Sequence, residues 1–201
     1  APAKRVFIHG SKGAVKAIFF FFSIHLRKGK NAKLSPSMDN IYLDIGAKDK
    51  AEVLAQGIHV GAIATFEDGF EALNDDYYIG RALDNRLGGF AIAQVARALY
   101  DQRDKLPFSL YIVNAVQEEV GLRGAQMIAE RIQPQAAIVI DVTHDTTTPM
   151  LDVKKSGEVK CGDGPSITYA PAVHTILRNL IIDVAEKNEI PIQREASSRS
   201  T

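Results

Sequence analysis

Cysteine is almost absent from the sequence. The single cysteine, Cys161, cannot form a disulfide within the chain, so a disulfide framework is excluded. Chains without disulfides are typical of reducing compartments, and we expect a cytoplasmic protein.

No charge of one sign prevails. Lysine and arginine together number 24, aspartate and glutamate also number 24, and the formal net charge is zero. Nucleic-acid binding is driven by counterions released when basic side chains meet phosphates, so the lack of a basic excess argues against a nucleic-acid partner. A charge this close to neutral does little to oppose self-association, which fits an oligomer.

A hydrophobic run long enough to cross a membrane is also lacking. The longest apolar stretch is residues 17–24, whereas a spanning helix needs about 20 residues. Lys12 and Lys16 precede the stretch as in a signal peptide, but no small-residue cleavage site follows it. We interpret the stretch as a buried strand and expect no membrane partner.

Both ends of the sequence are unusual. The first residue is Ala1 rather than methionine, and the chain stops at Thr201 soon after a strand-like stretch, with no helix to close it. We therefore expect these residues to be part of a longer protein.

Residues 1–74 are expected to form a small β domain. Short runs of β-branched and aromatic residues alternate with Gly and Asn/Asp clusters, which is typical of strands joined by turns. Several short strands with few helices favour a small barrel or sandwich. The predicted strands cover residues 6–8, 15–24, 41–45 and 58–66.

Residues 75–201 show a different pattern, typical of a layered α/β domain. Three segments repeat apolar residues at helical spacing, and two continuous apolar runs have the composition of strands buried on both faces. The expected helices are residues 85–100, 121–132 and 172–188, and the expected strands are residues 108–116, 136–141 and 190–194.

Acidic side chains stand at three points of this second domain. Asp84 directly precedes a predicted helix, Glu118 and Glu119 follow the first continuous apolar strand, and Asp141 ends the second. Active sites of open α/β sheets form at the carboxyl ends of strands. Two of the three points lie there, and the loop that carries Asp84 could reach them.

Carboxylates that converge at one sheet edge repel one another unless protons or cations hold them together. Two divalent ions about 3.5–4 Å apart could be bridged by one carboxylate and flanked by others, and would lower the pKa of a bound water. A further carboxylate that is not a ligand must then take and deliver the proton. The adjacent Glu118 and Glu119 suit that division of roles.

Structural roles would explain the same residues. A glutamate pair at a helix start complements the helix dipole, Asp84 would serve as an N-cap, and Asp141 would cap a loop. His144 lies within reach of a metal site, yet a loop histidine is more often at the surface. His174 opens a helix, and we interpret it as a surface residue.

Four motifs follow one another in the second domain: GRALDNR (80–86), EEVGLRGA (118–125), DVTH (141–144) and GDGPSI (162–167). In this order they resemble the tetrahedral aminopeptidase family, which includes glutamyl and deblocking aminopeptidases and members once labelled endoglucanases. Residues 6–10 and 42–47 resemble the family's inserted β domain, so the resemblance spans nearly the whole chain. It implies a three-layer α/β/α catalytic domain with an inserted, small β-barrel-like domain that mediates assembly.

The resemblance also implies roles for single residues. Asp84 would bridge two metal ions, zinc or cobalt, Glu119 would bind one of them and Asp141 the other, and Glu118 would be the general base. The Asp84–Asn85 peptide bond is expected to be cis. The implied substrates are short peptides, and the implied assembly is a homo-oligomer, a dodecamer.

The sequence departs from the family pattern in its histidine ligands. The family has one metal-binding histidine before the inserted β domain and another towards the C-terminus, and neither segment is among the residues at hand. We therefore expect this chain by itself to bind metal poorly or to carry none. Asn85 stands where many relatives have aspartate, which we regard as a mild change.

Two other functions stay open from the sequence. The first is a glycoside hydrolase, in which two of the carboxylates act as acid and base without a metal ion. The second is a non-enzymatic assembly or binding module that lacks its histidine ligands. Hydrolysis of an amino-acid anilide only in the presence of zinc or cobalt would exclude the first, and an unaffected alanine variant of Glu118 would favour the second.

Overall fold

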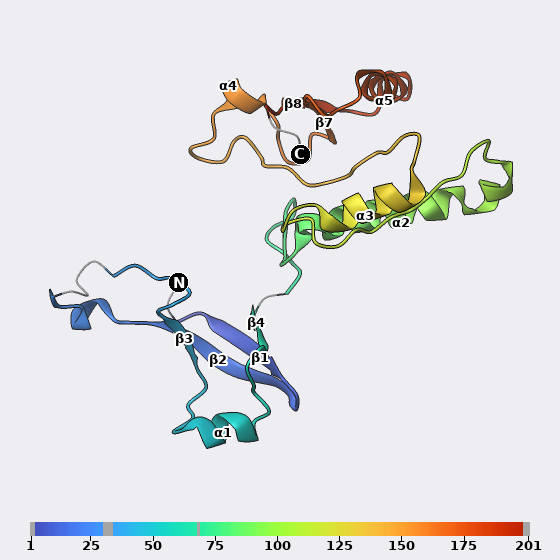
Figure 1. Ribbon diagram of the computed structural model, residues 1–201. Helices are drawn as coiled ribbons and strands as arrows, with labels where there is room; N and C mark the ends of the chain where they lie inside the picture. Colours follow the sequence, from blue (N-terminus) through green and yellow to red (C-terminus); the bar gives the residue numbers. More distant parts are fainter. Residues whose placement is uncertain (1–2, 30–33, 68, 199–201) are drawn as a thin grey trace. The chain divides into compact units, whose positions relative to one another are not determined.

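The computed structural model describes residues 3–29, 34–67 and 69–198 (Figure 1). The chain divides into two compact units, Ala1–Arg81 and Ala82–Thr201. Strands dominate the first unit and helices the second, so the chain has the mixed α/β fold that the sequence predicts. The assignment of an assembly domain and a catalytic domain stays a prediction.

The first unit is built on an antiparallel sheet with the strand order β3-β2-β1-β4 (Figure 1). Val6 and Ile8 of β1 are buried and pack with Ala17 of β2 in a small core. Their period of two is that of a strand with one buried face. The strands are β1 (Arg5–Gly10), β2 (Gly13–Phe21), β3 (Ile41–Asp44) and β4 (Ile63–Phe66).

The predicted strands of this unit are confirmed in position, but two of them are clearly shorter at one end than predicted. The predicted strand 15–24 ends at Phe21, Ile24 begins the 3-10 helix η1 (Ile24–Leu26), and only one face of the strand is buried. Only residues 63–66 of the predicted strand 58–66 pair, because a turn from Ala62 N to His59 O (3.0 Å) precedes them. Within the described residues, β3 and β4 each have a single neighbouring strand, so the sheet is open and a barrel is not confirmed. A separate hairpin joins β5 (Glu71–Ala72) to β6 (Tyr78–Ile79).

Helix α1 (Lys50–Ala55) is too short for its periodicity to be recognised in the sequence, but its start carries a capping signal. Asp49 Oδ1 accepts a hydrogen bond from Glu52 N (2.9 Å), and Glu52 Oε2 accepts one from Lys48 N (2.9 Å). The first bond satisfies a backbone N–H group that a helix start leaves without a partner, and the second holds the residue before the cap. The spacing Asp-x-x-Glu is the sequence signal for this helix start.

The residues after α1 are held against the turn between β1 and β2. Ser11 N donates to Gly57 O (2.8 Å), and Lys12 Nζ donates to Ala55 O (2.8 Å). Gly57 has a φ of +81°, and a Cβ there would lie 2.7 Å from Lys12 N. Only glycine therefore fits at this contact, which connects the helix to the sheet.

The second unit contains a β-α-β element. Strands β7 (Ser166–Tyr169) and β8 (Gln193–Ala196) pair in parallel and are connected through α5 (Thr175–Lys187). Parallel neighbours require a crossover connection of this kind. Ile182 and Ala185 are the buried residues of α5.

The predicted helices of this unit are confirmed, with small shifts at their ends, and the last predicted strand lies a few residues later, as β8. None of the described helices combines the length and the hydropathy that crossing a lipid bilayer requires. The remaining helical elements are α2 (Leu83–Leu99), η3 (Tyr100–Lys105), α3 (Arg123–Ile132) and α4 (Val153–Ser156).

The two continuous apolar runs, residues 108–116 and 136–141, do not form strands. A strand is defined by its hydrogen bonds to a neighbour, and within the described residues neither run is paired with one. Their side chains are correspondingly accessible, with Val139 87% exposed. A three-layer arrangement depends on these runs as central strands, and it stays a prediction.

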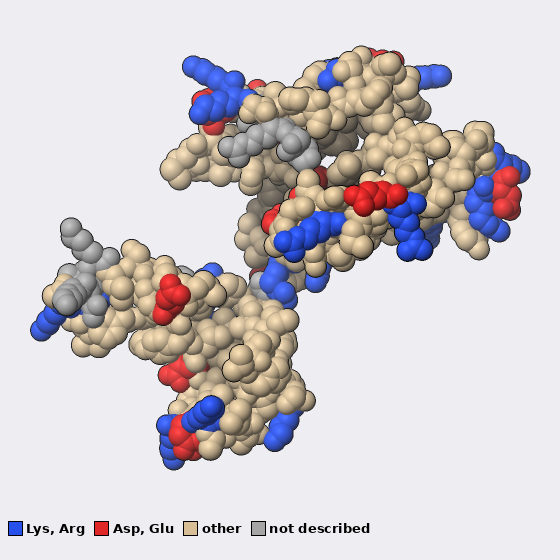
Figure 2. Space-filling view, in the orientation of Figure 1, with Lys and Arg blue, Asp and Glu red and all other residues tan. Residues whose placement is uncertain are grey.

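Many large apolar side chains are exposed in both units. Val60 and Met150 are fully exposed, and Figure 2 shows wide uncharged areas between the charged side chains on the face drawn. Extensive apolar surface of this kind is typical of proteins that bury it against a partner.

Replacement of Gly57 tests the contact between α1 and the β1–β2 turn. Gly57→Ala should lower the free energy of unfolding more than Gly61→Ala. Both residues have positive φ, where a side chain costs about 1–2 kcal/mol. Only at Gly57 does a Cβ also meet backbone, which adds about 1–3 kcal/mol of overpacking. Urea titration measures the difference, and equal losses would show that the contact contributes nothing.

Candidate functional site

Asp84 lies at the irregular start of α2. Asp84 (φ −84°, ψ 110°) and Asn85 (φ −117°, ψ 57°) are not helical, and the peptide bond between them is cis, as expected. The regular helix is capped by Asn85, whose Oδ1 accepts a hydrogen bond from Gly88 N (2.8 Å). Asp84 is therefore not the cap, and the structural explanation offered for it is wrong.

Asn85 also joins this helix start to the segment that carries Asp141. Its Nδ2 donates to Ile140 O (2.7 Å), directly before Asp141 in the chain. Each of the two predicted ligands, Asp84 and Asp141, is thus adjacent to one end of the same hydrogen bond. The structure brings these two segments together.

Glu118 and Glu119 lie in a tight turn before α3. Glu118 O accepts from Gly121 N (3.1 Å) and Leu122 N (3.0 Å), and Val116 O accepts from Gly124 N (3.0 Å). A Cβ at Gly124 would overlap Val116 O, so the turn requires glycine there.

Complementing a helix dipole does not account for the glutamate pair. Helix α3 begins at Arg123, and its first turn contains no acidic residue. The side chains of Glu118 and Glu119 are exposed. The turn therefore fixes their backbone and leaves both carboxylates accessible to solvent.

Asp84, Glu119 and Asp141 have the chemical groups that bind divalent cations, but their side chains do not surround a common point. Carboxylate oxygens are suitable donors to zinc or cobalt, and with Asp84 shared between two ions each ion would have two of them, where such sites usually include imidazole as well. In the parts of the chain that the structure describes, however, no three Asp, Glu, His or Cys side chains are close enough to hold a metal ion. A metal site made of Asp84, Glu119 and Asp141 stays a prediction.

The two histidines considered in the sequence analysis lie in different surroundings. His144 is exposed, in the loop after Asp141. His174 is the N-cap of α5, where its Nδ1 accepts a hydrogen bond from Leu177 N (3.4 Å). His174 is exposed at the helix start, as expected from the sequence, and the hydrogen bond that caps the helix is the additional finding.

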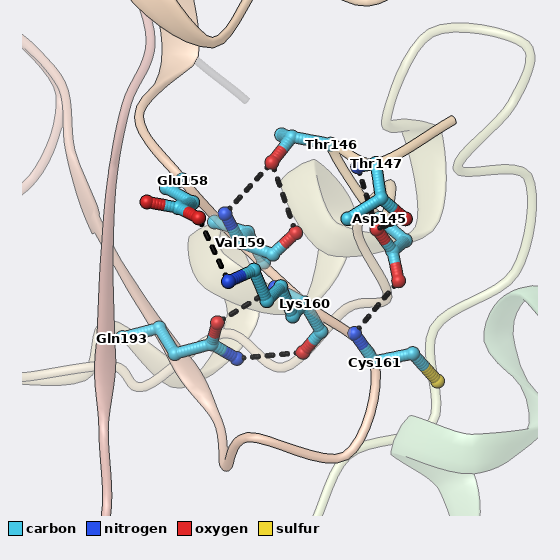
Figure 3. A network of polar contacts seen from close by, with 8 residues as sticks. All are labelled: Asp145, Thr146, Thr147, Glu158, Val159, Lys160, Cys161 and Gln193. Atoms are coloured by element: carbon cyan, nitrogen blue, oxygen red, sulfur yellow. Dashed lines mark hydrogen bonds and ion pairs between the residues drawn. The ribbon is translucent and has the colours of Figure 1, made fainter. Parts of the chain in front are cut away.

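A polar network fixes the chain just after the loop that contains Asp141 and His144 (Figure 3). Asp145 Oδ1 accepts from Thr147 Oγ1 (2.6 Å) and Thr147 N (2.7 Å), and Asp145 Oδ2 accepts from Cys161 N (2.9 Å). The pKa of Asp145 is lowered from its ordinary value, most strongly by the hydrogen bond from the Thr147 hydroxyl. The N–H groups of Cys161 and Thr147 lower it further, and the charge of Lys160 contributes least. The ionised carboxylate thus ties residue 145 to residue 161.

Thr146 and Gln193 complete the network (Figure 3). Thr146 is buried, and it exchanges backbone and side-chain hydrogen bonds of 2.8–3.0 Å with Val159. Gln193 of β8 accepts from Lys160 N (2.7 Å) and donates to Lys160 O (2.9 Å) and Gly164 O (2.8 Å). Together these bonds attach the loop that carries the GDGPSI motif to both β8 and the segment after Asp141.

Sequence reasoning did not find these residues. The run Asp145-Thr146-Thr147 does carry a local signal, because Asp and Thr side chains commonly bond backbone groups two residues on. That signal predicts a turn but not its distant partner. Gln193 has no comparable signal within its strand.

Comparison with known proteins gives consistent matches. The sequence model of the M42 glutamyl aminopeptidase family matches residues 1–201. The lysyl aminopeptidase of Pyrococcus furiosus is 31% identical over 202 residues, which cover 99% of this chain and 56% of that protein. This chain spans about half the length of the curated relatives it matches.

Solved structures match the whole fold. The TET aminopeptidase of a marine sediment archaeon, Thaumarchaeota archaeon SCGC AB-539-E09, has a TM-score of 0.87 at 28% identity, with 100% of this chain and 56% of that chain covered. The TET1 peptidase of Pyrococcus horikoshii, described as assembling into a tetrahedron or a large octahedral shell, has a TM-score of 0.74 at 27% identity, with 99% and 58% covered.

The network around Asp145 should depend on pH. The pKa of Asp145 is lower in the folded protein than in an unfolded chain. The ionised carboxylate therefore stabilises the fold at pH values above the ordinary pKa of aspartate, and this contribution is lost as the pH falls through the folded-state pKa. In Asp145→Asn a single acceptor oxygen is left for two groups, Thr147 and Cys161 N, and the charge is lost, so the Cys161 amide should lose part of its hydrogen-exchange protection at every pH.

The matched control is Asp163→Asn, an exposed change in the same loop, which should leave Cys161 protected. Protection factors, measured by NMR across the acidic range, test this. Unchanged protection of Cys161 in Asp145→Asn would rule out the carboxylate as the anchor of this loop.

Proposed function

The chain belongs to the M42 glutamyl aminopeptidase family, and from this premise we propose that the whole protein removes N-terminal residues from short peptides. The match extends over all residues of the chain, and the relatives include proteins named as aminopeptidases. This family match is the observation that carries the proposal. An aminopeptidase is a hydrolase that acts at a free N-terminus, and a closed oligomer of the kind proposed below would admit short peptides rather than folded proteins.

The proposed site contains the four predicted carboxylates. Asp84 would lie between two divalent ions, with Glu119 and Asp141 each on one of them. The chemistry supplied by such ions, zinc or cobalt, is Lewis acidity toward a carbonyl group and a water molecule. The hydrogen bond from Asn85 to Ile140 O (2.7 Å) supports this grouping for Asp84 and Asp141.

Glu118 would act as the general base. It would take a proton from the attacking water and deliver it to the nitrogen of the departing peptide. Its exposed position in a backbone-fixed turn supports this role, because the carboxylate is accessible while its main chain is held.

The whole protein is proposed to be a homo-oligomer, a dodecamer, in which the first unit forms a barrel-like assembly domain inserted into a three-layer catalytic domain. The P. horikoshii relative, described as assembling into a tetrahedron or a large octahedral shell, supports a homo-oligomer, and the solved structure of PhTET1-12s, described as a dodecamer, supports that number. Exposed aromatic side chains of the sheet, where the Phe20 and Tyr42 rings lie 4.9 Å apart and Tyr42 is 51% exposed, also support a homo-oligomer. The single cysteine supports a cytoplasmic location.

The proposal predicts metal-dependent hydrolysis by the whole protein. Amino-acid p-nitroanilides should be cleaved with zinc or cobalt present, and a chelator should abolish cleavage. Glu118→Gln should lower kcat about 10²–10⁴-fold without changing the amount of bound metal. Glu130→Gln is the matched control, since Glu130 is an exposed α3 residue bonded to Gln126, and it should have full activity.

The competing functions give different results in the same assays. A glycoside hydrolase would cleave a glucan and ignore the chelator. A non-enzymatic assembly module would show no hydrolysis, and its Glu118 variant would match the unmodified protein in every property. Either result would contradict the proposed function.

A further inference from the structure

Asp141 lies in a short span between two anchored residues. On one side, Ile140 O accepts the hydrogen bond from Asn85 Nδ2 (2.7 Å). On the other, Thr143 Oγ1 donates to Glu195 Oε2 (2.9 Å). Only Asp141 and Val142 separate the two anchors, so the position of the Asp141 backbone depends on both.

Glu195 is well suited to serve as a fixed acceptor. It lies on β8 opposite Thr168 of β7, and its second oxygen, Oε1, accepts from Thr168 Oγ1 (2.7 Å). An ionised carboxylate accepts hydrogen bonds and donates none, and bonds to a charged acceptor are stronger than neutral ones. Both oxygens therefore bind threonine hydroxyls, one from the paired strand and one from the segment after Asp141.

The residues beyond Thr143 are held as well. Asp145 binds Cys161 N (2.9 Å), and Thr146 binds Val159. Thr143 is thus the first of several residues in this segment whose side chains bond distant parts of the chain, and it directly follows Asp141 and Val142. Displacement of the Asp141 backbone from its present position would strain or break the hydrogen bond between Thr143 and Glu195.

The orientation of the Asp141 side chain is set within the same span. Asp141 Oδ1 accepts from Val142 N (2.8 Å). This bond depends on the backbone and side-chain torsions of Asp141, and the Thr143–Glu195 bond restrains the backbone on the C-terminal side of that residue. The remaining oxygen, Oδ2, is in an exposed residue and available to a ligand.

We propose that Thr143 and Glu195 are positioning residues that hold the Asp141 carboxylate for the reaction. The inference rests on the proposed function, in which Asp141 is part of the catalytic site. Residues that orient a ligand without touching substrate typically change affinity or activity about 10–100-fold when they are lost. A small displacement of a reacting group has a similarly large effect on rate.

Three variants of the whole protein test this assignment. Thr143→Val removes the hydroxyl and keeps the shape, and Thr143→Ser keeps the hydroxyl. Thr168→Val is the matched control, because it removes the other hydroxyl bonded to the same carboxylate while the backbone pairing of β7 with β8 still holds residue 195. Thr143→Val should lower kcat about tenfold or more with little change in KM, whereas Thr143→Ser and Thr168→Val should retain kcat.

A second readout does not depend on catalysis. Hydrogen exchange should show the Val142 amide losing protection in Thr143→Val and keeping it in Thr143→Ser and Thr168→Val. Glu195→Ala removes the oxygen that accepts from Thr143 and should give the same loss. Because Thr143 is exposed, its replacement should leave the fold intact.

The outcomes separate this inference from the proposed function. Whole protein without peptidase activity would contradict the proposed function. Active protein in which Thr143→Val keeps both kcat and Val142 protection would overturn the positioning role alone. Equal losses of kcat in Thr143→Val and Thr168→Val would also overturn it, because they would indicate general destabilisation of the β7–β8 pair.

Discussion

The hydrogen bond from Asn85 to the Ile140 carbonyl is the contact on which the candidate site depends. It connects residues 55 positions apart, and places the start of α2 beside the segment that ends at Asp141. The same amide group caps the helix through Gly88 N, and a Cβ at residue 88 would lie 2.5 Å from Asn85 Oδ1. One side chain therefore both starts the helix and joins two of the carboxylate-bearing segments, provided that residue 88 is glycine.

Backbone anchors, rather than burial, determine where the site residues lie. All four predicted carboxylates are exposed, yet the main chain next to each is held, by the turn before α3 for the glutamate pair and by the bonds of Thr143, Asp145 and Thr146 after Asp141. Exposed charged groups avoid the desolvation cost of burial. This arrangement suits carboxylates that must stay ionised and accessible to a ligand.

The helices of the second unit were predictable from the sequence because helical period is a local signal, whereas the capping role expected for Asp84 belongs to Asn85. The apolar runs 108–116 and 136–141 were not predictable, because composition indicates that a segment favours a strand but not that a partner strand lies beside it. The four acidic positions were proposed from their places at the ends of predicted elements, and their shared site stays a prediction. Asp145 and Gln193 were missed because their partners lie 16 and 33 residues away, so only the tertiary structure shows what they bind.

The central claim is that Asp84, Glu119 and Asp141 belong to one metal site of an aminopeptidase. The most direct measurement is anomalous diffraction from crystals of the whole protein grown with cobalt or zinc. The account predicts two ions, with carboxylate oxygens of these three residues at about 2.0–2.2 Å. Ions bound elsewhere, or no ion within reach of these three carboxylates, would contradict it.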